Sequence, residues 1–435
     1  MILDNYYTAS QGNDTVFHLN PPKIKFGRGA LRELGFEAKA LGMSKIALFT
    51  DPQIVNLQPV TIAKNSLEAQ EINVTVYSDV EVEPTDRSLE AAINFAQAKK
   101  FDGYISVGGG SVIDTTKATN LYVTYPADLL DYVNAPVGRA LPVPGPLKPH
   151  IACPTTFGTA SECTGMAIFD LLKQQLKTGI ASMHLRPNLG IVDPNSLKTL
   201  PSEVVAANGF DVFSHAVESL TCKPFTGRVS PLDPSQRPIY QGANPYSDIS
   251  CIEAIKLIGA NLVRAVNDRE DDSLNDALSF SGVLAGIGFG NAGCHIPHAM
   301  SYAVAGLVND YKPTGWETNH PLVPHGSSVI VNAPAVFRFT GPACPERHLE
   351  AAKAMGADVS ETESSNAGQI LANQVINMMK ETNMPSGISS IGYSTMDIEA
   401  LTERTWAQQR LLVNSPRPIE KSDIRELFKM AMNYF

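Results

Sequence analysis

The first 200 residues alternate short apolar runs with helical stretches, and this alternation limits the possible folds more than any other feature of the chain. The runs KIALFT, NVTVYSDV and DGYISV are separated by helical stretches such as LEAAINFAQAKK, and further strand-like runs occur at HIACP and LGIVDP. Alternation of this kind implies β-α-β units and a mostly parallel sheet. We therefore predict an α/β domain over residues 1–200.

The pattern changes at Pro201, beyond which helical periodicity dominates, as in SDISCIEAIKLIGANLVRAV and ERHLEAAKAMGA. An Asp193-Pro194 turn and Pro201 bracket a short linker, so we place a boundary near Leu200 and predict an all-α domain over residues 201–435. Residues 221–247, which are rich in Pro, Gly and Ser, and residues 307–324 interrupt the helices as long loops. Loops longer than about 15 residues are usually functional or disordered.

Composition excludes several classes of function. A net charge of -10 with no basic run argues against nucleic acid or an anionic membrane as partner. No apolar run approaches the roughly 20 residues of a membrane span, and residues 1–17 resemble neither a signal nor a transit peptide. Six scattered cysteines lack C-x-x-C spacing, which favours reduced thiols. We expect a soluble cytoplasmic enzyme that acts on small molecules. We also expect it to assemble as a homo-oligomer, most simply a homodimer.

A glycine turn follows the run YISV, at Gly108-Gly109-Gly110-Ser111, and precedes the helical stretch SVIDTTKATNLYV. Such a turn lets backbone N–H groups approach a phosphate, and the helix N-terminus adds its positive dipole. Asp114 lies on the first turns of that helix and could orient the cofactor. The alternative is that three glycines make only a tight strand-to-helix turn.

Two further segments suggest a dinucleotide. Asp51 ends the strand-like KIALFTD, where a carboxylate can accept hydrogen bonds from both ribose hydroxyls and so favours NAD over NADP. In PTTFGTASE the hydroxyls of Thr155, Thr156 and Thr159 could bond adenine or phosphate. Both segments can also be read as ordinary turns and caps.

Four residues of the C-terminal half could bind one divalent metal. Asp211 and His215 lie four apart in the helical stretch SEVVAANGFDVFSHAVESL, so both side chains leave one helical face. His298 begins a second helical stretch and His325 lies in a Pro-His-Gly turn. One carboxylate and three imidazoles suit Fe(II) or Zn(II) and leave positions for substrate. The alternative is that these histidines are satisfied core residues.

Together, GGGSVID, PTTFGTASE, NGFDVFSHAVES, GCHIPHAMSY and VPHGSS resemble the iron-containing (group III) alcohol dehydrogenases. Within that family VEPTD, DYVNAPVG and RPIYQGANPYSD are most similar to the hydroxyacid-oxoacid transhydrogenase branch. The resemblance implies a dinucleotide-binding α/β domain, an all-helical domain and an active site in the cleft between them. It also implies metal ligation by the four residues above, and cofactor contacts at Asp51, Gly109, Gly110, Ser111, Asp114, Thr155, Thr156 and Lys177.

Two positions depart from the family pattern. Many members have a histidine with a proton-relay role where this chain has Tyr302, and the usual G-T-G-S-E is Gly158-Thr-Ala160-Ser-Glu162 here. The tyrosine resembles the transhydrogenase branch. The methyl group of Ala160 is expected to have only a small effect on the cofactor loop.

The expected chemistry is hydride transfer to or from a nicotinamide, with the metal acting as a Lewis acid on the substrate oxygen. His295 and Tyr302 could pass the proton outward or serve only as structural hydrogen-bonding groups. The resemblance implies 4-hydroxybutyrate as donor and 2-oxoglutarate as acceptor; the alternatives are a plain NAD-dependent dehydrogenase of a small primary alcohol, a metal-dependent lyase, or a non-catalytic metal-binding protein. Arg228 and Arg237 are either a clamp for the substrate carboxylates or solvated surface residues.

Overall fold

A computed structural model describes residues 6, 11–174, 176–316, 318, 320–360 and 362–435. The chain forms two compact units. The first comprises Pro21–Leu200, and the second comprises Pro201–Phe435 together with the N-terminal segment Met1–Asn20. The sequence predicts residues 1–200 as one domain, whereas the structure groups the N-terminal segment with the helical unit.

The first unit is built on a six-stranded sheet in the order β1-β8-β5-β4-β2-β3, in which every pairing is parallel. Its strands are β1 Ile24–Phe26, β2 Lys45–Phe49, β3 Asn73–Tyr77, β4 Gly103–Gly108, β5 His150–Pro154 and β8 Leu189–Val192. A separate antiparallel pair is formed by β6 Met166–Leu171 and β7 Leu176–Ala181. The predicted mostly parallel sheet is therefore confirmed.

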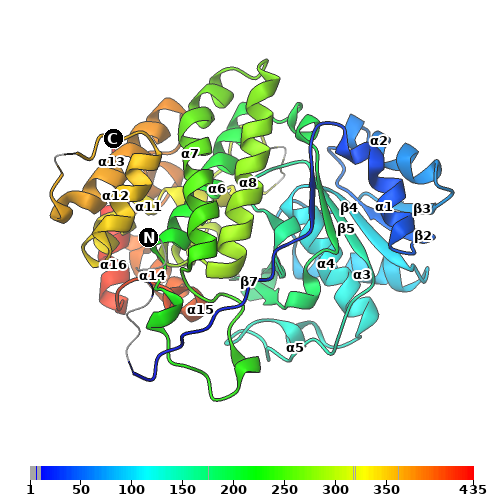
Figure 1. Cartoon of the computed structure of the whole chain (residues 1–435), viewed down its shortest axis with the longest axis horizontal. Coiled ribbons are helices and arrows are strands. Elements are labelled where there is room, and N and C mark those ends of the chain that lie inside the picture. Colours follow the sequence, from blue (N-terminus) through cyan, green and yellow to red (C-terminus); the bar gives the residue numbers. More distant parts are fainter. Residues whose placement is uncertain (1–5, 7–10, 175, 317, 319, 361) are drawn as a thin grey trace. The chain divides into compact units, whose positions relative to one another are not determined.

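Helices cover both faces of this sheet (Figure 1). They are α1 Leu34–Ala40, α2 Gln58–Glu68, α3 Asp86–Gln97 and α4 Gly110–Thr124, whereas α5 Leu129–Tyr132 packs with β6 and β7. Side chains alternate along β2, because successive residues of a strand point to opposite faces. Ile46 and Leu48 pack in the cluster that holds α1 and α2. Ala47 and Phe49 pack in the cluster that holds α3 and the start of α4.

The strand order reverses at β2. The chain passes from β2 to β3 on one side, and β4 then pairs with β2 on its other side. In open parallel sheets, ligands bind beyond the carboxyl ends of the strands at such a switch point. Asp51 follows the end of β2, and the glycine turn follows the end of β4, so both predicted cofactor segments lie at this point of the sheet.

The second unit is helical, as predicted. Its helices are α6 Ser202–Thr221, α7 Pro245–Asn267, α8 Asp272–Ala292, α9 Ile296–Gly306, α10 His325–Ile330, α11 Ala333–Thr340, α12 Pro345–Ala354, α13 Ala367–Glu381, α14 Ile398–Trp406, α15 Gln409–Leu412 and α16 Lys421–Met430. Among the residues described, no single helix is long and apolar enough to span a membrane, although the pair α8 and α9, bent by 103°, passes on length and composition.

Helix α6 is the centre of this unit and packs against α7, α8, α10 and α12. Almost all of its residues from Val205 to Thr221 are buried. Close helix packing depends on small residues, since a Cβ at Gly209 would lie 2.2 Å from Leu262 of α7. A polar side chain on such a helix must find a partner, because burying it unpaired is costly.

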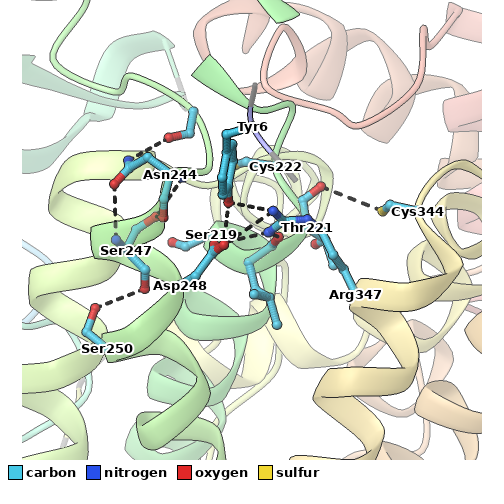
Figure 2. A network of polar contacts seen from close by, with 12 residues as sticks. Tyr6, Ser219, Thr221, Cys222, Asn244, Ser247, Asp248, Ser250, Cys344 and Arg347 are labelled. Atoms are coloured by element: carbon cyan, nitrogen blue, oxygen red, sulfur yellow. Dashed lines mark hydrogen bonds and ion pairs between the residues drawn. The ribbon is translucent and has the colours of Figure 1, made fainter. Parts of the chain in front are cut away.

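The N-terminal segment is attached to the helices by two buried polar contacts. Figure 2 shows Tyr6 between Asp248 of α7 and Arg347 of α12. The Tyr6 hydroxyl donates to Asp248 and accepts from Arg347 Nη2 at 2.5 Å. The guanidinium of Arg347 also contacts Asp248 at 3.0 Å.

The second contact involves Asp14, which is 1% exposed and pairs with Arg228 at 3.0 Å and Arg237 at 2.9 Å. Its hydrogen bond from Arg237 lowers the pKa of Asp14 to about 2, against the effect of burial. The two arginines of the long loop are thus tied to a carboxylate of the chain itself. This pairing favours a structural role for both arginines, and a role as a clamp for a substrate carboxylate stays a prediction.

Candidate functional site

Helix α6 carries three buried polar residues on successive turns. Asp211 is 2% exposed, His215 is 4% exposed and Glu218 is fully buried. Their spacing of four and then three residues places them on one face of the helix. On a helix buried this completely, such a face requires ion pairs, hydrogen bonds or a bound metal.

Two histidines from other helices join this face. His298 lies in the first turn of α9, and His325 is the first residue of α10 rather than part of a turn. The Nε2 atoms of His215, His298 and His325 lie 3.7, 3.6 and 3.6 Å from Asp211 Oδ1. One ligand atom of each of the four residues lies within 4.8 Å of all the others. The structure therefore brings together the four residues that the sequence predicts as metal ligands.

The residue after His325 explains how α10 reaches α6. A Cβ at Gly326 would lie 1.8 Å from the carbonyl oxygen of Ala207 and 3.1 Å from Asp211 Cβ. Only glycine allows this approach, because even the smallest side chain would overlap the backbone of α6. The Pro-His-Gly sequence thus places the His325 imidazole against Asp211.

Two contacts that the sequence analysis missed hold the imidazoles in place. His298 Nδ1 lies 2.5 Å from Glu218 Oε1, and Glu218 Oε2 accepts the His295 backbone N–H at 2.7 Å. A carboxylate bonded to one imidazole nitrogen orients the other nitrogen toward a metal. Phe289 of α8 stacks on His215, with ring centroids 3.9 Å apart and an interplanar angle of 8°. Glu218 could have been found from its place on the same helical face as Asp211 and His215.

The four residues fit a divalent cation. Asp211 Oδ1 and His298 Nε2 are buried, and neither has a hydrogen-bond partner among the described residues. Burial lowers the pKa of His215 to about 3, which keeps its imidazole neutral. Burial raises the pKa of Asp211, but His215 and His325 outweigh it and hold this pKa below its usual range. Neutral imidazoles and an ionised carboxylate are the forms in which these groups bind metals. Burial lowers the pKa of His298, but Cys294 and Glu218 outweigh it and raise this pKa, so a metal bound there would displace a proton.

The four-residue cluster is open on one side. The His325 side chain is 24% exposed, whereas the side chains of Asp211, His215 and His298 are 3%, 5% and 7% exposed. A second group of possible ligands, Glu218, Cys294 and His298, shares His298 with the first. Since Glu218 occupies His298 Nδ1, the nitrogen left for a metal is Nε2, which belongs to the first group.

The two predicted catalytic residues lie beside the cluster in different settings. His295 is fully buried, and its Nε2 lies 3.0 Å from the Thr221 hydroxyl. Burial lowers its pKa to about 4. Tyr302 lies one turn beyond His298, and its hydroxyl accepts a hydrogen bond of 2.9 Å from Arg410 of α15. A structural role suits His295, whereas Tyr302 has a cationic partner that the sequence does not predict.

In the first unit, the glycine turn packs against the PTTFGTASE loop. A Cβ at Gly110 would lie 2.6 Å from Thr159 Oγ1, and one at Gly109 would lie 3.2 Å from Thr156 Cγ2. The backbone N–H of Thr155 donates to the Gly108 carbonyl at 3.0 Å. The loops after β4 and β5 thus meet at the N-terminus of α4, where free N–H groups and the helix dipole favour an anion.

The other predicted cofactor residues already have partners within the chain. Asp51 accepts the backbone N–H groups of Gln53 at 2.9 Å and Ile54 at 3.2 Å. Asp114 accepts hydrogen bonds from Ser161 and from the Ile168 N–H, the latter at 2.9 Å.

Two more of these residues are joined through Glu83. Lys177 is paired with Glu83 at 2.5 Å and with Asp170 at 3.0 Å. The backbone N–H of Glu83 donates to Ser111 Oγ at 3.1 Å, so Glu83 connects Lys177 with the start of α4. Cofactor contacts by Asp51, Asp114, Lys177 and Ser111 stay predictions, since these bonds give each residue a structural role as well.

Comparison with known proteins assigns both units to one family. Residues 21–194 match the model for iron-containing alcohol dehydrogenase, and residues 239–432 match the C-terminal model of the Fe-containing alcohol dehydrogenase family. The chain is 45% identical to a probable hydroxyacid-oxoacid transhydrogenase, mitochondrial, of Dictyostelium discoideum, over 99% of this chain and 82% of that protein.

Two solved structures have a similar fold. A 1,3-propanediol oxidoreductase superposes with a TM-score of 0.84 at 26% identity, over 96% of this chain and 100% of that one. A sulfoacetaldehyde reductase from Bifidobacterium kashiwanohense, in complex with NAD+, superposes with a TM-score of 0.78 at 22% identity, over 96% of this chain and 99% of that one. At 22% identity this second likeness concerns the fold alone.

The relatives correct one expectation from the sequence. Four transhydrogenases that are 44–45% identical to this chain are named as mitochondrial proteins, so the cytoplasmic location expected from the sequence is wrong. That expectation rested on the composition of the first residues and on the scattered cysteines. Neither property distinguishes the cytoplasm from another reducing compartment.

Proposed function

The chain belongs to the iron-containing alcohol dehydrogenase family, and we propose that it is a hydroxyacid-oxoacid transhydrogenase that uses a divalent metal and NAD. Membership of the family makes it an oxidoreductase that transfers hydride between hydroxy and oxo groups of small molecules. The proposal adds the substrates and the cofactors. Its main support is the buried cluster of Asp211, His215, His298 and His325, whose ligand atoms lie within 4.8 Å of one another.

The four residues of this cluster would hold the metal, which when bound supplies a Lewis acid for a substrate oxygen. Fe(II) is proposed because of the family, although the same ligands suit Zn(II). Glu218 contacts His298 Nδ1 and so leaves Nε2 as the nitrogen that would bind the metal. Phe289 holds the plane of the His215 ring. The partial exposure of His325 gives a small substrate access from that side.

NAD would bind at the switch point of the parallel sheet. Gly109, Gly110 and Ser111 would present backbone N–H groups to the diphosphate, and the Asp51 carboxylate would accept the ribose hydroxyls. A carboxylate at this position repels a 2'-phosphate, which favours NAD over NADP. Thr155, Thr156 and Thr159 would complete the contacts from the adjoining loop, with Asp114 and Lys177 supporting them. A protein of similar fold has been crystallised with NAD+.

The substrates are proposed from the relatives, which are named hydroxyacid-oxoacid transhydrogenases and match nearly the full chain at 44–45% identity. In the proposed reaction 4-hydroxybutyrate loses a hydride and a proton and becomes succinate semialdehyde. The hydride passes to NAD and from there to 2-oxoglutarate, which takes up a proton and becomes 2-hydroxyglutarate. One substrate is oxidised and the other is reduced by two electrons, so bound NAD is regenerated in each cycle.

The test is an assay without added cofactor. Metal-loaded protein, freed of unbound nucleotide by gel filtration, is mixed with 4-hydroxybutyrate and 2-oxoglutarate, and 2-hydroxyglutarate is measured by mass spectrometry. We expect many turnovers for each protein molecule. Product formation that depends strictly on added NAD would instead favour the second candidate, an NAD-dependent dehydrogenase of a small primary alcohol. Assembly as a homodimer also stays a proposal, to be checked by light scattering.

A further inference from the structure

Arg410 of α15 is a half-buried cation that contacts Tyr302 of α9, and no carboxylate pairs with it among the residues that the structure describes. Its Nη2 donates to the Tyr302 hydroxyl at 2.9 Å, and the guanidinium carbon lies 5.5 Å from the centre of the Tyr302 ring. The pKa of Arg410 is raised, because Tyr302 and Tyr240 outweigh the opposing effect of burial. The guanidinium therefore stays charged in a setting where an anion would stabilise it.

Other arginines of the helical unit are neutralised by the chain. Arg228 and Arg237 pair with Asp14, and Arg347 pairs with Asp248, at distances of 2.9 to 3.0 Å. Arg410 differs from these three in that its guanidinium donates to the hydroxyl of Tyr302 rather than to a carboxylate. An arginine presents planar, paired donors that match the two oxygens of a carboxylate.

Tyr302 links this cation to the four-residue cluster, because Tyr302 lies one turn beyond His298 on α9. Burial and Cys294 raise the pKa of Tyr240, while Arg410 and His298 both act to lower it. Tyr240 itself is held in place by Gly293, where a Cβ would lie 2.7 Å from Tyr240 Cβ. Through its bond to Tyr302, the guanidinium of Arg410 is thus connected to the helix that carries His298.

The two substrates of the proposed reaction share one feature that such a cation could recognise. In 4-hydroxybutyrate the carboxylate lies three carbon–carbon bonds from the carbon that gives up hydride. In 2-oxoglutarate the distal carboxylate lies three carbon–carbon bonds from the carbon that accepts it. One helical turn rises about 5.4 Å, which is similar to the length of a four-carbon hydroxy acid.

We propose that Arg410, held by Tyr302, binds the carboxylate that lies three bonds from the reacting carbon in both substrates. This inference rests on the proposed function and names the residue that would give the protein its preference for hydroxy acids over simple alcohols. A single anchor serves both half-reactions, because donor and acceptor present the same carboxylate at the same distance from the reacting carbon.

The test compares 4-hydroxybutyrate with butan-1-ol, which has the same carbon chain without the carboxylate, using metal-loaded protein and added NAD. We expect Arg410→Ala to lower kcat/KM for 4-hydroxybutyrate by about 10- to 100-fold, chiefly through a higher KM. The same substitution should change kcat/KM for butan-1-ol by less than about 3-fold. Arg410→Lys should recover part of the loss, since it keeps the charge without the paired donors. Arg425→Ala is the control, because Arg425 is a partly exposed arginine paired with Glu399.

Binding of glutarate, followed by calorimetry, gives a second readout that needs no turnover. Glutarate should bind the wild-type protein more tightly than the Arg410→Ala protein. If Arg410→Ala does not fold, Tyr302→Phe is measured in its place and should weaken glutarate binding by a smaller factor. If the wild-type protein prefers 4-hydroxybutyrate and Arg410→Ala or Arg410→Lys keeps that preference in full, the role of Arg410 is wrong and the proposed function survives. If the wild-type protein shows no preference for 4-hydroxybutyrate, the proposed substrates and the anchor are wrong together.

Discussion

Glu218 offers a sharp test of how the chain prepares a metal site, because it contacts His298 without belonging to the four-residue cluster. Its Oε1 lies 2.5 Å from His298 Nδ1, and its Oε2 accepts the His295 N–H at 2.7 Å. Loss of a carboxylate that orients a metal-binding imidazole typically weakens metal binding 10- to 100-fold. This range corresponds to about 1.4–2.7 kcal/mol of binding free energy.

Two substitutions separate orientation from simple destabilisation. Glu218→Gln keeps an acceptor for His298 Nδ1 and removes the negative charge, so we expect about a tenfold rise in the metal Kd. Glu218→Ala leaves two buried donors without an acceptor, each worth about 1–3 kcal/mol of folding free energy, and should raise the Kd further. Glu203→Gln is the control, because Glu203 is an exposed residue in the first turn of the same helix.

The assay is a titration of metal-free protein with Zn(II) in competition with a chelator, accompanied by urea unfolding of each variant. Unfolding identifies variants that bind poorly only because they are partly unfolded. If Glu218→Gln binds Zn(II) as tightly as the wild type while His298→Ala does not, the proposed role of Glu218 in orienting His298 is refuted.

Three further substitutions test other parts of the structure. Gly326→Ala places a Cβ 1.8 Å from the Ala207 carbonyl oxygen, so we expect a loss of about 1–3 kcal/mol in urea unfolding and weaker Zn(II) binding; unchanged values would contradict this packing. Ala160 has a φ of 45°, and Ala160→Gly should raise the free energy of unfolding by about 0.5–1 kcal/mol; a decrease would show that no strain is relieved. Burial raises the pKa of Glu162 from 4.5 to about 7, so the folded state keeps this proton to a higher pH than the unfolded state does. The wild type should therefore lose about 3 kcal/mol relative to Glu162→Gln as the pH rises from 4.5 to 7, and parallel pH profiles of the two proteins would exclude the shift.

Local periodicity carries most of the information about the fold. Alternating strands and helices predict the parallel sheet, and helical periodicity predicts the second unit, because both patterns depend on near neighbours in the chain. The attachment of the N-terminal segment could not be predicted in this way. Asp14 and Arg228 are 214 residues apart, and nothing in their local sequences indicates that they pair.

In the candidate site, too, residues could be predicted where local sequence identifies them and could not where they depend on contacts between distant segments. Asp211 and His215 can be grouped from their spacing on one helix, and His298 and His325 from their chemistry and sequence context. Arg410 could not be found, because it meets Tyr302 across 108 residues of sequence. The sequence also suggests cofactor contacts for Asp114 and Lys177 without revealing their partners inside the chain, since ion pairs between distant segments leave no periodic signal.

The most direct test of the central claim follows the hydride itself. Protein is given 4-hydroxybutyrate carrying deuterium on the carbon that bears the hydroxyl, together with 2-oxoglutarate and a large excess of unlabelled NADH. If hydride passes through a cofactor that stays bound, the 2-hydroxyglutarate formed from 2-oxoglutarate should carry deuterium at C2 in an amount that the added NADH does not change. Deuterium that falls in proportion to the added NADH, or that is absent from 2-hydroxyglutarate, would contradict the proposed transhydrogenation.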